Sequence, residues 1–147
     1  MLATPAWVVA VLRSRVTTGV ARSVLTLPYW WSAIDKCLHP AEAIAEVAAL
    51  GVAVPLLAYL VLVTVQLIGS VMIICDWGAW FGAGALAVCT LIVTLLAHAF
   101  WIWDGQRRAD ELSVFLEHLA LTAGLVFAAQ VAQPDRAAAD LGSSPNL

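Results

Sequence analysis

Three long stretches of the chain contain almost no acid or base. Val52 to Cys75 is free of both, and Trp77 to Trp103 has His98 as its only acid or base. Leu112 to Ala132 has two ionisable side chains, both near its start. About 20 apolar residues are enough for a helix to cross the hydrocarbon core of a membrane, and all three stretches reach that length. Each stretch therefore predicts a membrane-spanning helix.

A further span is expected upstream of these three. Ser23 to Ile34 is free of charge but is too short to cross. Extended back to Val16, the segment takes in Arg22, whose long side chain can reach the nearer membrane surface. Pro28 predicts a kink in this helix. We therefore expect spanning helices over residues 16–35, 52–75, 79–103 and 112–133.

The segments between the spans predict how the helices are connected. The sequence "CDWG" is short enough for a tight turn, which makes the helices on either side antiparallel neighbours. The polar sequence "DGQRRADE" predicts a short loop, with Asp110 and Glu111 near the positive end of the next helix. In the longer first loop, Pro40 and Gly51 enclose a pattern typical of a short helix on a membrane surface. The apolar face of that helix is expected to hold Ile44, Val47 and Leu50.

The predicted fold class is an all-α membrane protein, a bundle of four transmembrane helices with short interfacial helices. The bundle is expected to occupy residues 16–133, after an N-terminal interfacial segment at 1–15. Residues 134–147 are predicted to be a disordered tail, because they have little apolar surface to bury. Small residues at four-residue steps favour close helix contacts. They are Gly78 and Gly82, and then Ala120, Gly124 and Ala128.

Composition supports lipid as the surroundings of these helices. The chain is 63% hydrophobic and 12% charged, and that charge content is roughly half of what soluble domains carry. A net charge of −3 without a basic cluster argues against nucleic acid as a partner. The basic residues divide slightly in favour of cytoplasmic termini. They are Arg13, Arg15, Arg22 and Arg136 on the terminal side, against Lys36, Arg107 and Arg108.

The three cysteines show no spacing typical of a metal site or a redox pair. Cys37, Cys75 and Cys89 are therefore expected to be free thiols that fill helix interfaces as apolar side chains. No metal site is predicted.

Several sequences, taken in order, resemble the DoxX family of small four-helix bacterial membrane proteins. They are "ARSVLTLPYWWSAIDKCLHPAEA", "LGVAVP", "HAFW" and "FLEHLALTAGLVF", between about Ala21 and Ala128. The resemblance implies a multi-pass protein of the bacterial cytoplasmic (inner) membrane and a subunit of membrane redox assemblies. The best-known relatives are linked to thiosulfate:quinone oxidoreductase. Where the family usually has a glutamate this chain has Gln66, and where it often has an asparagine this chain has His118.

Polar and indole side chains are expected at similar depths on three of the four helices. At ~1.5 Å per helical residue, Trp30 and Trp31 lie roughly 6–8 Å from the outer face, and His98 and His118 about 8–9 Å. Gln66 lies deeper, about 20 Å in. One interpretation is that these groups only tie the helices together. The other is a cleft for a quinone head group, formed by His98, Trp101, His118, Gln66, Trp30 and Trp31.

The histidine in "LLAHAFWIW" is expected to face the bundle interior, because an unpaired imidazole in hydrocarbon is costly. Its predicted partner is the Glu117–His118 pair or an indole of the first span. A haem held between His98 and His118 is disfavoured, since a bundle of four short helices leaves little room for a porphyrin. No covalently bound cofactor is predicted.

No predicted segment outside the membrane is longer than Lys36 to Gly51. Any domain that converts substrate is therefore expected on another chain, and no stand-alone enzymatic activity is predicted. The expected function is an accessory or anchor subunit of a larger, quinone-linked redox complex, with other membrane or peripheral subunits and lipid as partners. The alternative is a quinone-reactive subunit that takes part directly in electron transfer.

Overall fold

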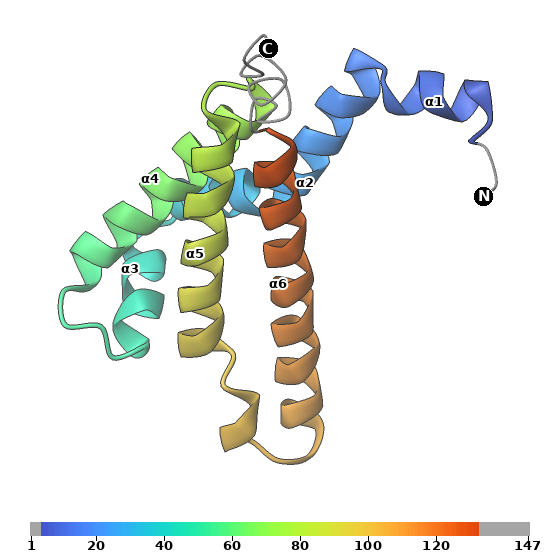
Figure 1. The fold of residues 1–147 in the computed structure, drawn as a ribbon. Coiled ribbons are helices and arrows are strands. Elements are labelled where there is room, and N and C mark those ends of the chain that lie inside the picture. The colour runs from blue at the N-terminus through green and yellow to red at the C-terminus, as the bar shows by residue number, and fades with distance from the viewer. Residues whose placement is uncertain (1–3, 133–147) are drawn as a thin grey trace, which may run out of the picture.

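All secondary structure in the described part of the chain is helical, which confirms the all-α class. The computed structural model describes residues 4–132, so the predicted disordered tail at 134–147 lies outside the described residues. The elements in chain order are α1 (Ala6–Leu12), α2 (Arg15–Leu38), α3 (Pro40–Ala49), α4 (Pro55–Ile74), α5 (Ala79–Ala97), η1 (Phe100–Ile102) and α6 (Gly105–Val131). Figure 1 shows α5 and α6 side by side, while α1, within the predicted interfacial segment, extends away from the other helices.

Three of the helical segments are long and apolar enough to cross a membrane. They are Pro55–Ile74, Ala79–Ile102 and Gly105–Val131. α2 is not among them, since Arg22 lies within it and the sequence "PYWWS" adds a stretch of low hydropathy. Three of the four predicted spans thus correspond to helices of sufficient length and hydropathy, α4, α5 and α6. The span at α2 stays a prediction.

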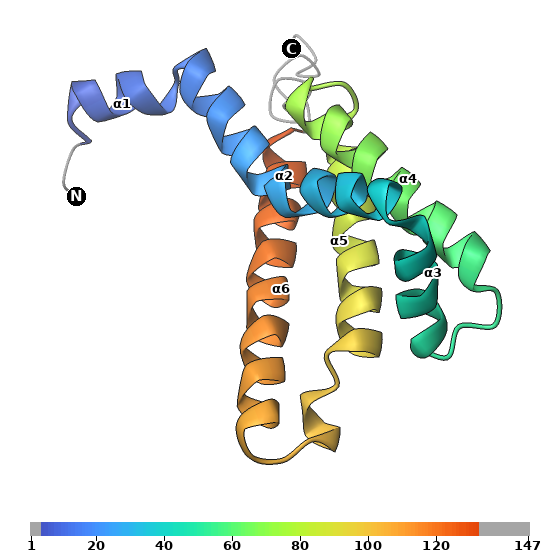
Figure 2. The same cartoon turned by 180° about the vertical axis from the view of Figure 1, so that it is seen from behind.

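α2 is a continuous helix that bends partway along its length. Its N-cap is Ser14, whose hydroxyl accepts a hydrogen bond of 3.3 Å from the backbone N–H of Thr17. Pro28 lies inside the helix, and Figure 2 shows α2 changing direction partway along. Such a bend is expected where a proline removes a backbone donor. The helix ends at Leu38, because Pro40 disfavours a helical conformation in the residue before it.

The turn between α4 and α5 is tight, as predicted. Asp76 and Gly78 in this turn have positive φ angles of 57° and 62°. A little further along, the two helices cross at a pair of glycines. A Cβ atom added to Gly82 would lie 2.8 Å from the backbone carbonyl oxygen of Gly69. The crossing confirms that α4 and α5 are neighbours and that Gly82 allows a close helix contact.

α5 is shorter than the helix predicted over 79–103. It ends at Ala97, and the chain continues through His98 into the short helix η1. Apolar residues follow Ala97, so hydropathy alone gives no signal for an end. Where further turns of α5 were predicted, His98 and the aromatic residues after it make side-chain contacts that are described below.

α6 begins at Gly105, well before the start predicted at Leu112. The sequence "DGQRRADE" is polar, but polarity indicates contact with water rather than the absence of a helix. Within it, the Gln106 amide donates a 2.8 Å hydrogen bond to Asp110, one helical turn later. The first turn of α6 has no acidic residue, so the prediction that Asp110 and Glu111 stabilise the positive end of this helix is wrong.

α3 confirms the short helix predicted in the first loop. Pro40 is its first residue, and Gly51, with a φ of 75°, follows its end. Its buried residues are Ala43 and Val47, which pack in one apolar cluster with Tyr59 of α4. α3 therefore lies against the ends of α2 and α4 (Figure 2).

Candidate functional site

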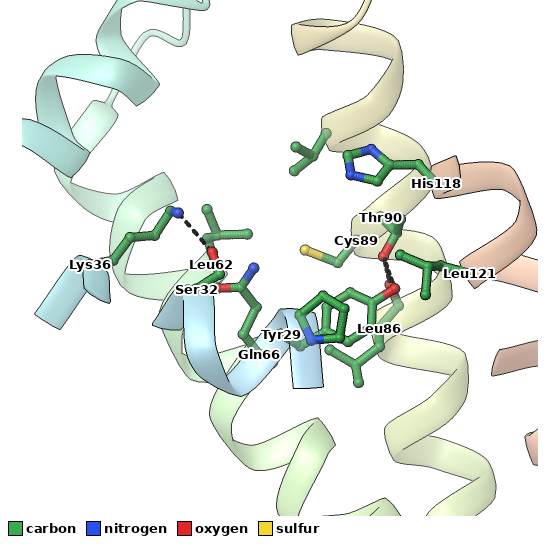
Figure 3. A pocket seen from close by; sticks show the side chains of 12 residues that line it. Tyr29, Ser32, Lys36, Leu62, Gln66, Leu86, Cys89, Thr90, His118 and Leu121 are labelled. Atoms are coloured by element: carbon green, nitrogen blue, oxygen red, sulfur yellow. Dashed lines mark hydrogen bonds between the residues drawn. The ribbon is translucent and has the colours of Figure 1, made fainter. Parts of the chain in front are cut away.

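A pocket with polar walls lies where α2, α4, α5 and α6 come together. Its volume is about 240 Å³, and all four helices contribute to its lining. Its polar side chains are Tyr29, Ser32, Lys36, Gln66, Cys89, Thr90 and His118. Its apolar ones are Pro28, Leu62, Leu86, Val93 and Leu121. Figure 3 shows Lys36, Ser32 and Gln66 on one side of this polar pocket, with Thr90 and His118 on the other.

Two buried hydroxyl groups connect α2 to α5 at the wall of the polar pocket. The Thr90 hydroxyl lies 2.7 Å from the backbone carbonyl oxygen of Leu86 and 3.1 Å from the hydroxyl of Tyr29. Because a carbonyl can only accept and a threonine hydroxyl has one proton, Thr90 donates to Leu86. Tyr29 then donates to Thr90. The phenol proton of Tyr29 is therefore donated within the protein and not to a ligand.

His118 is held by a threonine in the same way. Thr94 donates its only proton to the backbone carbonyl of Thr90, at 2.6 Å. The Nδ1 atom of His118 lies 2.9 Å from the same Thr94 hydroxyl and must therefore be the donor. In a neutral imidazole the other ring nitrogen, Nε2, is then without a proton. His118 has the capacity to accept a hydrogen bond at Nε2.

Gln66 contributes a second free acceptor. Its side-chain oxygen Oε1 is buried and has no hydrogen-bond partner among the described residues. A buried polar atom without a partner costs about 1–3 kcal/mol, so such atoms usually bind water or a ligand. The nearby Ser70 hydroxyl does not serve it, because that hydroxyl donates at 2.6 Å to the backbone carbonyl of Gln66.

Lys36 supplies the positive charge at the polar pocket. Its Nζ atom donates to the hydroxyl of Ser32 at 2.8 Å, as Figure 3 shows. Its backbone carbonyl accepts a 3.2 Å hydrogen bond from the hydroxyl of Tyr59, which fixes the end of α2 against the start of α4. An ammonium group has three protons. Two of them are therefore left for a ligand or for water.

His98 lies beside the polar pocket rather than in its wall. Its Nδ1 atom is 2.9 Å from the carboxylate of Glu111, and its ring meets that of His118 edge-on with centroids 5.0 Å apart. Of the predicted partners, His118 is in contact with His98 through its ring, whereas Glu117 is exposed; the hydrogen-bond partner is Glu111, which was not predicted. Glu111 lies in the first part of α6, a segment predicted to be a loop, and from there it reaches His98.

The three tryptophans of the predicted quinone site lie outside the polar pocket. Trp30 and Trp31 contact each other edge-on, with centroids 6.3 Å apart, and Trp31 is exposed. Trp101 is also exposed and packs with Phe100 and Phe115 beyond the end of α5. Of the six predicted site residues, the structure brings Gln66 and His118 together in the polar pocket, with His98 adjacent.

Comparison with known families gives a match to the DoxX family model over residues 18–99, more than half of the chain. The chain belongs to the DoxX family. The match covers α2 to α5, and with them all of the polar pocket except the side chains from α6. No curated protein matches the chain. No solved structure matches it either.

The sequence-based site of this DoxX-family protein misses several residues of the polar pocket. Tyr29, Ser32 and Lys36 are spaced three and four residues apart, which places them on one face of α2. That spacing is the signal that would have identified them. Cys89 lines the polar pocket, although the sequence suggests only an apolar role at a helix interface. Cys37 and Cys75 are exposed, and all three thiols are free.

Proposed function

We propose that this DoxX-family membrane protein crosses the membrane four times, with α2 as the first span. In the N-terminal part of α2, Arg22 forms an ion pair of 2.8 Å with Asp76, in the turn that follows α4. At the other end, the Lys36 carbonyl accepts a hydrogen bond from Tyr59, near the start of α4. α2 therefore extends along most of α4, which is itself long enough to span. We propose that the membrane is the bacterial inner membrane and that both termini lie on its cytoplasmic side.

We further propose that the protein is an accessory or anchor subunit of a larger, quinone-linked redox complex. The observation that carries this proposal is the small share of the described chain that lies between long helices. The longest such segment holds only α3, which packs on α2 and α4. A domain that oxidises a soluble substrate would then belong to another membrane or peripheral subunit.

Gentle solubilisation tests the subunit proposal. A tagged copy at its native expression level should migrate in native electrophoresis well above the size of a 15.6 kDa chain in its detergent micelle. Quinone-linked activity should follow the larger species. The proposal is wrong if the isolated chain alone retains the full quinone-linked turnover.

The alternative, a quinone-reactive subunit, is favoured by one specific observation, the buried and unpaired side-chain oxygen of Gln66, a residue that lines the polar pocket. A quinone presents two carbonyl acceptors, and the quinol formed from it presents two hydroxyl donors. Lys36 offers protons to the first form, whereas Gln66 Oε1 and His118 Nε2 offer acceptors to the second. The polar pocket thus has groups for both redox states of a quinone head group.

A short-chain quinol tests this alternative. Replacing Gln66 by Met, which removes the acceptor at similar volume, should weaken quinol binding roughly threefold to tenfold, since a hydrogen bond contributes about 0.5–1.5 kcal/mol. Gln130→Met is the matched control, because Gln130 is an exposed glutamine on α6. Equal affinities for the Gln66→Met protein and the unchanged protein would contradict a quinol in the polar pocket.

The geometry of His98 and His118 does not support haem as a cofactor. A haem bound by two histidines needs the macrocycle between their rings. Here the two rings are in edge contact, with their centroids 5.0 Å apart, which leaves no space between them for a macrocycle. Haem therefore forms no part of the proposal.

A further inference from the structure

A second, much larger cavity lies between α4 and α5 and extends to α3. Its volume is about 820 Å³. Figure 1 shows why it exists: α4 and α5 are close at their connecting turn and diverge toward α3. Its walls are almost entirely apolar, and Lys36 and Glu46 are the only charged residues that line it. We refer to this cavity as the apolar groove.

The apolar groove and the polar pocket share part of their walls. Lys36, Leu62, Cys89 and Val93 line both. The two cavities therefore lie next to each other, with these four side chains between them. A polar pocket that borders an apolar groove fits a ligand that is polar at one end and apolar along the rest of its length.

The length of the apolar groove indicates the kind of chain it accommodates. Along α5 its lining runs from Trp80 to Ala97, about 26 Å at ~1.5 Å per residue. A lipid tail in one leaflet spans only ~15 Å, half of a hydrocarbon core of ~30 Å. The apolar groove is thus longer than the depth of one leaflet and has room for a chain that extends beyond it.

Small residues make room in the apolar groove. Gly84 and Ala85 of α5 and Ala58 of α4 line it, and a Cβ atom added to Gly84 would meet no atom within 4 Å. The position of Gly84 differs from that of Gly82, where a Cβ atom would clash with α4. Gly84 leaves open space rather than allowing a close helix contact.

We propose that the apolar groove binds the isoprenoid chain of the quinone whose head group lies in the polar pocket. This inference rests on the quinone-reactive alternative under the proposed function. It adds the path of the chain and a preference for long-chain over tail-less quinones. A helix from a second copy would fill the apolar groove but would not account for the wall that it shares with the polar pocket.

Filling the apolar groove tests the proposal. Gly84→Phe places a large side chain in it, and Gly19→Phe is the matched control, a helical glycine on α2 that also has open space around it and lines neither cavity. The probes are a long-chain isoprenoid quinone and the same head group without a chain. Dissociation constants are measured with each protein in lipid nanodiscs.

The unchanged protein should bind the long-chain quinone at least tenfold more tightly than the tail-less one. Gly84→Phe should reduce this ratio to below about twofold while leaving the affinity for the tail-less quinone within twofold, and Gly19→Phe should preserve the ratio. Ala85→Leu, a smaller addition on the same wall, should reduce the ratio partly and serves if Gly84→Phe does not fold.

Three results would overturn the inference. The first is equal affinity of the unchanged protein for both probes, and the second is an unchanged ratio in the groove-filling variants. The third is a change of oligomeric state in Gly84→Phe, measured by light scattering, which would identify a second copy as the occupant. If the tail-less quinone fails to bind the unchanged protein, the quinone site itself is wrong, a result distinct from the loss of chain selectivity.

Discussion

Arg22 of α2 and Asp76 of the α4–α5 turn form an ion pair, with a guanidinium nitrogen 2.8 Å from a carboxylate oxygen. The pair joins two segments that are far apart in the sequence, with α3 and α4 between them. It places Arg22, in the N-terminal part of the bent helix α2, at the same end of the molecule as the α4–α5 turn. The positive charge inside the first predicted span therefore lies at the end of α4, level with the connecting turn.

The coupling between Arg22 and Asp76 should be small but measurable. The Asp76 side chain is 59% exposed, so solvent screens the pair. A double-mutant cycle with Arg22→Gln and Asp76→Asn should give a coupling free energy of about 0.2–1 kcal/mol. Asparagine is chosen because it tolerates the positive φ at this position. Thermal unfolding in detergent is the measurement, and strictly additive effects would show that the pair contributes nothing.

Gly82→Ala should destabilise the protein, whereas Gly84→Ala should not. At Gly82 the added methyl group would lie 2.8 Å from a backbone oxygen of α4, so the helices must separate, at a cost of about 1–3 kcal/mol. At Gly84 the methyl group meets open space, and alanine favours the helix by up to ~1 kcal/mol. The melting temperatures of the two variants, measured in the same detergent, test this prediction. Equal values would contradict the glycine crossing.

The native cysteines provide a test of topology. Cys37 and Cys75 are both exposed, and they lie at opposite ends of α2 and α4. In variants that keep one of them and carry Cys89→Ala, a membrane-impermeant maleimide added to intact cells should label Cys37 and spare Cys75. Labelling of Cys75 alone would reverse the proposed orientation. Labelling of both would show that α2 and α4 do not span the membrane.

His98→Leu and Glu111→Leu should have coupled effects on stability and leave ligand binding nearly unchanged. Each variant breaks the 2.9 Å contact and should cost about 1 kcal/mol or less, as intramembrane hydrogen bonds typically do. The double variant should be no less stable than the weaker single one. Because neither residue lines the polar pocket, the affinity for a tail-less quinone should stay within twofold.

His118→Leu is the contrasting change, since His118 does line the polar pocket. It should weaken binding of the tail-less quinol at least threefold, through loss of the Nε2 acceptor. A loss of binding in His98→Leu as large as that in His118→Leu would mean that His98 itself contacts the ligand. The assignment of His98 to a structural role would then be wrong.

The existence of the apolar helices and the connections on either side of α4 are determined by the sequence, because both depend on neighbouring residues. Hydropathy over about twenty residues predicts α4, and the short sequence "CDWG" predicts the turn that follows it. Pro40 and Gly51 mark the ends of α3 for equally local reasons. The DoxX resemblance, read from short motifs along the chain, is confirmed by the family match.

The tertiary structure alone decides where α5 ends and α6 begins. It also decides which residues line the polar pocket. His98 leaves the helix where Glu111, from the next long helix, comes within hydrogen-bonding distance. Gln66 and His118 meet in the polar pocket, whereas Trp30 is not part of its lining although it follows a residue that is. Depth in the membrane follows from the rise per residue, but the direction of a side chain depends on how its helix rotates and bends against its neighbours. Packing sets that rotation, because Gly69 and Gly82 fix the crossing of α4 and α5 while the Tyr29–Thr90 hydrogen bond holds α2 against α5.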